Sequence, residues 1–116
     1  MTYFDTAVIA VPSAKKDDYL MHAQEAAPLF KNEGALRVIE AWGDDVADGE
    51  KTSFPMAVKC EEGETVVVSF IEWPDKATRD VAMPKVMEAM QTKMTTPMPF
   101  DGSRMIFGGF DCISDE

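Results

Sequence analysis

Residues 64–80 read Glu-Thr-Val-Val-Val-Ser-Phe-Ile-Glu-Trp-Pro-Asp-Lys-Ala-Thr-Arg-Asp and predict a strand followed directly by a helix. The β-branched and aromatic side chains of residues 66–71 are typical of a strand. Pro74 ends this strand because proline has no N–H to donate to a ladder. Asp75 then stands where a carboxylate accepts hydrogen bonds from the first free amides of a helix.

The predicted strand is apolar on both of its faces. Side chains alternate between the faces of a strand, so Val66, Val68 and Phe70 point one way while Val67 and Ile71 point the other. Such a strand needs cover on both sides. Because the chain has helices enough for one side only, we expect the other side of the sheet to meet a second copy of the chain.

The rest of the chain supplies the partners of this strand. We expect further strands at 3–11, 35–46 and 104–110, and helices at 14–33 and after Asp75. Ser13 is the expected cap of the first helix. Pro28 should kink that helix, and Pro84 should kink or split the second one. Residues 54–60 alternate in a way that fits a short edge strand, without requiring one.

The order strand, helix, strand, strand, helix, strand is that of the ferredoxin-like βαββαβ fold. The sequence therefore predicts an α+β protein with an antiparallel sheet and two helices on one face. At 116 residues the chain is expected to form one domain, residues 1–116.

Composition excludes several classes of partner. The chain carries 21 acidic and 11 basic side chains, a net charge of −10, which disfavours nucleic acid and anionic membrane surfaces. No apolar run approaches the ~20 residues of a membrane span, and the first residues do not resemble a secretion signal. The two cysteines form no disulfide framework. We therefore expect a cytoplasmic protein.

Several short motifs are spread along the chain. They are Ala-Pro-Leu-Phe-Lys (27–31), Gly-Ala-Leu-Arg (34–37), Glu-Ala-Trp-Gly-Asp-Asp-Val (40–46), Ile-Glu-Trp-Pro (71–74) with Arg79-Asp80, and Met-Pro-Phe-Asp-Gly (98–102) with Arg-Met-Ile (104–106) and Gly-Gly-Phe (108–110). These motifs resemble those of the YbaA-like family of bacterial proteins of unknown function. The resemblance covers nearly the whole chain, and its last motif is specific. It implies the dimeric α/β-barrel superfamily, in which two ferredoxin-like sheets face each other, and it implies no catalytic residues.

Metal and cofactor sites find little support in the sequence. Asp44, Asp45, Asp48 and Glu50 carry the oxygen ligands that hard cations prefer, but Val46 interrupts the spacing of a calcium loop. A solvated acidic loop is the expected structure. His22 is the only histidine, so one chain cannot build a site from several histidines. Haem ligation or proton transfer by His22 requires that it face a cavity. We expect no metal and no cofactor.

Our hypothesis for a ligand site combines a few polar groups with an apolar wall. The site is expected between the sheet and the second helix, or between paired sheets. Strand parity shows which residues share a face, but not which face meets the helices. Asp75 and Arg79 are spaced for a surface ion pair. The polar candidates are Glu40, Glu72 and His22, and the wall candidates are Trp42, Phe70, Met87 and Met90, the last two from a methionine stripe at 83, 87, 90 and 94.

Two functions follow from this hypothesis. The first is a homodimer that binds a small apolar or planar molecule in a cavity of the sheet. The alternative is a cofactor-light enzyme of the monooxygenase type, which rests on analogy with the superfamily fold alone. The chain has no GxSxG, phosphate-loop or GxGxxG motif, so whether it is an enzyme stays open.

Overall fold

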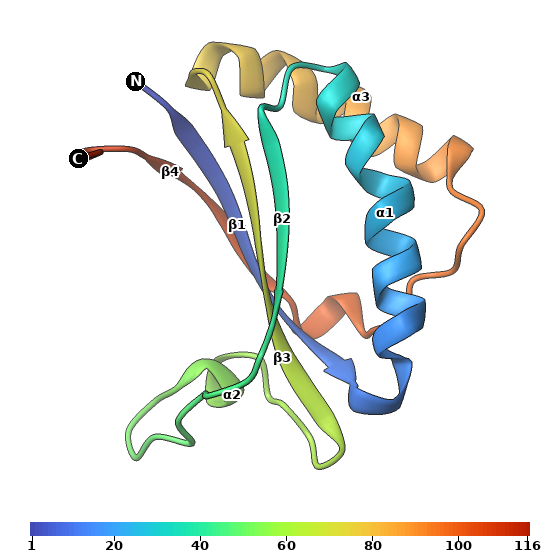
Figure 1. Ribbon diagram of the computed structural model, residues 1–116, viewed down its shortest axis with the longest axis vertical. Helices are drawn as coiled ribbons and strands as arrows, with labels where there is room; N and C mark the ends of the chain where they lie inside the picture. Colours follow the sequence, from blue (N-terminus) through green and yellow to red (C-terminus); the bar gives the residue numbers. More distant parts are fainter.

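The computed structural model describes residues 1–116 and forms one sheet with its two long helices on the same side (Figure 1). A 3₁₀ turn precedes α1 and another precedes β4, at Ser13–Lys15 and Gly102–Arg104. None of the helices is both long and apolar enough to span a bilayer. The elements are β1 (Tyr3–Pro12), α1 (Lys16–Asn32), β2 (Arg37–Trp42), α2 (Phe54–Ala57), β3 (Glu64–Trp73), α3 (Lys76–Lys93) and β4 (Ile106–Asp111).

The four strands are arranged in the order β2-β3-β1-β4, and every neighbouring pair is antiparallel. Consecutive strands β2 and β3 are therefore neighbours, whereas each long helix connects two strands that are not adjacent. This arrangement confirms the predicted α+β, ferredoxin-like class.

The helix-covered face of the sheet is built from rows of side chains that cross the strands. One row joins Tyr3 to Trp73, and both pack with Phe30 and Ala26 of α1 and with α3. Further along the strands, Val67, Ile9 and Trp42 pack around Tyr19 of α1. These two apolar clusters hold the helices against the sheet, chiefly through buried area.

The opposite face is covered at one end only. There Val58, from the segment between β2 and β3, packs on Val8, Ala10 and Val66. Figure 1 shows this segment, with α2, on the side of the sheet away from α1 and α3. Four large apolar side chains on the remainder of this face, Ile39, Phe70, Ile106 and Phe110, are between 38% and 56% exposed. We call these four residues the open patch.

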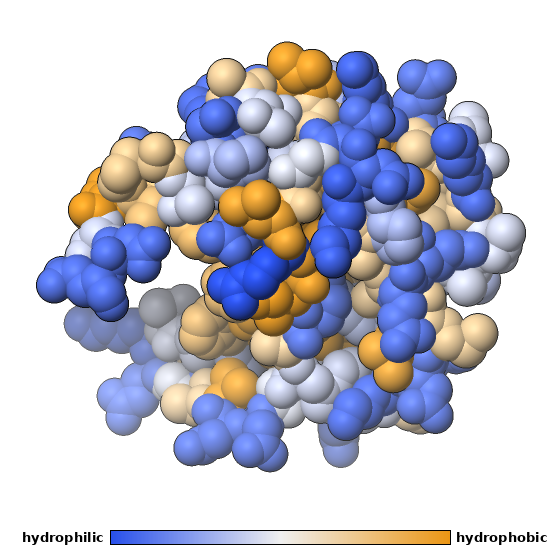
Figure 2. All heavy atoms as spheres, turned by 45° about the horizontal axis from the view of Figure 1, so that its top comes forward, coloured by the Kyte–Doolittle hydropathy of each residue, from blue (hydrophilic) through white to orange (hydrophobic).

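Hydrophilic and hydrophobic residues are interspersed over the surface brought forward in Figure 2. Leu20, Met21 and Val81 are exposed apolar residues of the helices. Single residues of this kind are normal on folded proteins.

Three local expectations are corrected by the structure. Residues 54–57 form the short helix α2 rather than an edge strand, because the Ser53 side chain accepts a hydrogen bond from the amide of Met56 and Pro55 suits a first helical turn. Ser13 does not cap α1, since a 3₁₀ turn intervenes. Of the kink or split expected at Pro84, the split does not occur, since α3 is continuous across Pro84 and buries Ala82 and Val86 on either side. Asp75 caps α3 as predicted, accepting from Thr78 N at 2.7 Å.

Candidate ligand-binding site

A cavity of about 360 Å³ lies between the helix-covered face, the helices α1 and α3, and the loop after α3. Fifteen of its 22 lining residues are hydrophobic. Its volume lies in the lower part of the range of small-molecule pockets, roughly 300–1,000 Å³.

Small side chains on the sheet explain the hollow. The row that crosses the middle of the helix-covered face runs Glu40, Ser69, Ala7 and Phe107. Its two central members are small, whereas the flanking clusters hold tryptophan and tyrosine side chains. On α1, Ala23 also lines the cavity. The helices therefore rest on the large residues at both ends and leave a gap over the small ones.

Glu40 is the central polar group of the cavity. Its side chain on β2 accepts a hydrogen bond from the hydroxyl of Tyr19 on α1, and its other oxygen accepts one from Ser69 Oγ on β3 at 2.8 Å. Burial raises the pKa of Glu40, although both hydrogen bonds and the nearby His22 oppose that rise. Burial, followed by the charge of Glu40, also raises the pKa of Tyr19.

His22 lines the same cavity from α1 and is buried. Its Nδ1 atom lies 3.0 Å from Thr96 Oγ1, and its ring meets Phe100 edge-on with the centroids 6.3 Å apart. Both partners belong to the loop after α3, so His22 helps to position the part of that loop that closes the cavity.

Glu25 fixes the start of that loop to α1. Its carboxylate accepts hydrogen bonds from the amides of Thr95 and Thr96, at 2.9 Å each, and from both threonine hydroxyls. These bonds, led by that from the Thr95 hydroxyl, lower the pKa of Glu25 to about 2.

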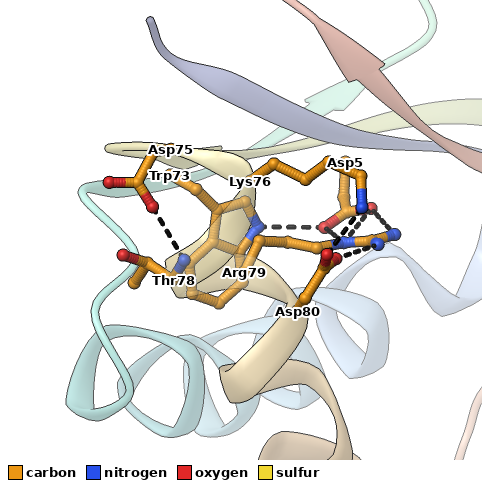
Figure 3. Close-up of polar contacts among 7 residues, drawn as sticks. All are labelled: Asp5, Trp73, Asp75, Lys76, Thr78, Arg79 and Asp80. Atoms are coloured by element: carbon orange, nitrogen blue, oxygen red, sulfur yellow. Dashed lines mark hydrogen bonds and ion pairs between the residues drawn. The ribbon is translucent and has the colours of Figure 1, made fainter.

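A second polar group, the ion pair of Asp5 on β1 and Arg79 on α3, lines the cavity (Figure 3). Arg79 Nη2 donates to Asp5 Oδ1 at 2.7 Å, and Trp73 Nε1 donates to Asp5 Oδ2 at 2.9 Å. Arg79 Nη1 donates to Asp80 at 3.0 Å, and the guanidinium lies 5.3 Å from the Tyr3 ring centre. The hydrogen bonds from Arg79 to Asp5 and, to a lesser extent, to Asp80 raise the pKa of Arg79. All three nitrogens of the guanidinium are engaged.

The structure brings together four of the seven residues predicted for the site. Glu40, His22, Met87 and Met90 all line the cavity. Trp42 lies on the same face and packs its ring against Tyr19, with the centroids 6.5 Å apart, but it does not line the cavity.

Glu72 and Phe70 belong to the opposite face, so the expectation that Glu40 and Glu72 share one site is wrong. Glu40 of β2 pairs in register with Ser69 of β3, so both side chains lie on the same face of the sheet. Glu72 is three residues from Ser69 along β3, and its side chain therefore lies on the other face. Glu72 instead binds Arg37 Nε at 2.9 Å. Phe70 is part of the open patch.

The sequence analysis did not assign four polar residues of the cavity to the site: Asp5, Tyr19, Ser69 and Arg79. Asp5 is the one charged residue of the first strand, and Ser69 interrupts the apolar run of the central strand. Both interruptions were available signals of a polar site inside the fold. Arg79 was expected to pair with Asp75, but Asp75 is occupied as the helix cap. No three acidic, histidine or cysteine side chains lie together in a way that could hold a metal ion.

Residues 2–102 match the family described as proteins of unknown function, DUF1428. The chain is also 55% identical over 117 residues to the uncharacterized protein YbaA of Escherichia coli K12, with both chains covered completely, and equally to YbaA of Shigella flexneri. The chain therefore belongs to the DUF1428 family of YbaA-like proteins.

Solved structures with the same fold have little sequence in common with this chain. A dimeric ferredoxin-like protein from an uncultured marine organism aligns with a TM-score of 0.61 at 11% identity over the whole of both chains. A point mutant of MhuD, solved with two manganese protoporphyrin IX molecules bound per active site, aligns with a TM-score of 0.60 at 14% identity, covering 98% of this chain and 97% of MhuD. These similarities establish the ferredoxin-like fold alone.

Proposed function

We propose that this protein is a homodimer that binds a small apolar molecule in the cavity between its sheet and helices. The observation that carries the proposal is Glu40, a partly buried carboxylate that lines a largely apolar cavity. An apolar pocket with a few placed polar groups is the usual form of a small-molecule site. Here the walls supply affinity, and Glu40 supplies orientation.

A porphyrin does not fit this cavity. The two propionates of a porphyrin need cationic partners, but the Arg79 guanidinium of the cavity is fully engaged by Asp5 and Asp80. Glu40 and Asp5 would instead repel them. The proposal therefore includes no haem.

The open patch supports the homodimer. Its four large apolar side chains share the uncovered face of the sheet, two on β2 and β3 and two on β4, and exposed apolar surface of this kind marks an interaction surface. A second copy fits it because the same surface on both chains makes a self-complementary interface. The marine ferredoxin-like protein of the same fold is described as dimeric.

Glu40 also supports the alternative, a cofactor-light enzyme of the monooxygenase type. Burial raises the pKa of Glu40 above its ordinary value, which makes this carboxylate a stronger base than an exposed glutamate. In such an enzyme Glu40 would act as a general base toward a bound substrate, with Tyr19 and Ser69 holding its side chain in place.

Native mass spectrometry of freshly purified protein tests the binding function. We expect the mass of a dimer with a small molecule carried through purification, and displacement of that molecule by a neutral fluorescent probe such as N-phenyl-1-naphthylamine. Ala7→Leu and Ala23→Leu fill the cavity from the sheet and from α1, and both should abolish binding. Ala77→Leu, at an exposed position of α3, is the matched control. Binding that survives both cavity-filling changes would refute the proposed site.

The same preparation separates the enzyme from the binding protein. For a cofactor-light monooxygenase, the substrate itself supplies the two electrons and two protons that convert the second oxygen atom of dioxygen to water. Exposure of anaerobically purified protein to dioxygen should therefore give a released ligand that has gained one oxygen atom and lost two hydrogen atoms, and Glu40→Gln should prevent this. A ligand mass that stays constant in air, with binding intact, would favour the binding function.

A further inference from the structure

We infer that the ligand is a slender, neutral amphiphile, whose hydroxyl group donates to Glu40 and whose hydrocarbon tail crosses the sheet to leave beside Phe107. This inference rests on the proposed function and specifies the class of molecule that the cavity takes. It follows from the length of the cavity, the chemistry of its inner end and the exposure of its outer end.

The length follows from the strand register. Glu40, Ser69, Ala7 and Phe107 form one row across all four strands, and both end members line the cavity. Neighbouring strands lie about 4.8 Å apart, so the row spans roughly 14 Å. A volume of about 360 Å³ spread over that length is narrow. The shape suits an extended chain with one polar end.

The inner end of the cavity, at Glu40, favours a ligand group that donates a hydrogen bond. Each oxygen of Glu40 accepts one bond from the protein, from Tyr19 and from Ser69. A carboxylate has about four acceptor positions in all, so acceptor capacity remains for a ligand. A hydroxyl head group can donate to it and leaves no charge to be desolvated.

Charged head groups are disfavoured in the same place. A carboxylate head would meet Glu40 and Asp5, while the guanidinium of Arg79 is already bound. An ammonium head would meet an opposite charge, but it would lose far more hydration than a hydroxyl on entering an apolar cavity. The chain as a whole, with a net charge of −10, also repels anions.

The outer end is apolar and open. Phe107 on β4 is 77% exposed although it lines the cavity, and Met87 and Met98 are lining residues that are also exposed. Methionine side chains adapt to the shape of what they contact. An exposed apolar mouth opposite a polar end gives a bound tail its direction.

Displacement of N-phenyl-1-naphthylamine by homologous series of amphiphiles tests the inference near neutral pH. For 1-alkanols of about six to twelve carbons, each methylene should tighten binding about fourfold until the cavity is filled. At equal chain length the alkanol should bind at least about tenfold more tightly than the alkanoate, which meets a like charge.

Two variants assign the ends of the ligand. Glu40→Gln should narrow the preference for alkanol over alkanoate by about tenfold and keep the dependence on chain length. Phe107→Ala should weaken only the longest alkanols and leave the head-group preference unchanged. Glu72→Gln, a carboxylate on the opposite face, is the matched control and should change neither.

The outcomes distinguish this inference from the proposed function. If alkanoates or alkylammonium ions bind as tightly as alkanols, or if affinity does not rise with chain length, the inference is overturned while the binding function stands. If Glu40→Gln leaves the head-group preference intact, the assigned orientation is wrong. If neither the fluorescent probe nor any amphiphile binds the wild-type protein, the proposed function fails with it.

Discussion

The two faces of one sheet differ in what covers them, although the same strands build both. On the helix-covered face, Asp5 and Arg79 form an ion pair whose side chains are 13% and 24% exposed, and both residues line the cavity. On the other face, Glu72 pairs with Arg37, whose side chain is 65% exposed, next to the open patch. Similar residues therefore serve an interior on one side and a surface on the other. The elements that pack on each face, rather than the types of residue in the pair, decide whether an ion pair is buried or exposed.

The largest expected effect is on the open patch. Phe70→Asp places a charge at the centre of the proposed dimer interface and should raise the dimer dissociation constant at least about a hundredfold, since central aromatic residues dominate interfaces. Sedimentation velocity at micromolar concentration measures this. Val81→Asp, at an exposed site on α3, is the control and should leave the dimer intact. A wild-type protein that sediments as a monomer would show that the open patch has another role.

The two ion pairs give the next largest contrast. Asp5→Ala removes the acceptor of the Trp73 N–H and leaves Arg79 with Asp80 as its one acidic partner, and should lower the free energy of unfolding by about 2–4 kcal/mol. Arg37→Ala removes the more exposed pair and should cost less than about 1 kcal/mol. Urea denaturation at a fixed protein concentration compares them. Equal losses would mean that the helix-covered face does not shield its ion pair.

Glu40→Gln tests whether burial raises the pKa of Glu40, through the pH dependence of the free energy of unfolding. Because burial raises the pKa of Glu40, the folded state penalises its charged form, and the wild-type protein loses stability as pH rises above the ordinary glutamate value of 4.5. The variant avoids this loss, so it should be the more stable protein at neutral pH, by about 1.4 kcal/mol for every pH unit that separates the folded-state pKa from the ordinary one. The advantage should disappear below pH 4.5. A variant less stable than wild type at neutral pH would contradict this prediction.

Glu25→Gln should show the opposite dependence and the smallest effect. The pKa of Glu25 is lowered to about 2, so its contribution to stability is present above the ordinary value of 4.5 and is lost as pH falls toward 2. The variant should therefore be less stable than wild type at neutral pH, and the two should converge near pH 2. Thermal unfolding across this range measures the difference. If the difference is constant with pH, the Glu25 charge does not hold the loop.

Most of the fold could be predicted because its signals are local. The alternation of residues 66–71 and the Pro74-Asp75 pair place β3 and the start of α3 correctly. The segment 54–60 could not be assigned in the same way, since its alternation suits a strand while Ser53 and Pro55 suit a helix. The segment forms the helix α2, whose first turn is capped by the Ser53 side chain.

The site was predictable only in part, because parity groups residues without saying which group meets the helices. It placed Glu40 with Trp42, and Glu72 with Phe70, and both groupings hold in the structure. Joining Glu40 to Glu72 required the register between β2 and β3, which depends on contacts between distant residues. The ion pair of Asp5 and Arg79 joins residues 74 positions apart, and no local pattern reveals that distance.

The small side chains at positions 7 and 69 have a consequence for the history of this family. Only two positions are concerned, and their small side chains leave room for the cavity in this chain. A lineage that replaced alanine and serine there with leucine or phenylalanine would keep the fold and lose its interior. Comparing these two positions across the family would therefore separate the relatives that keep the cavity from those that fill it.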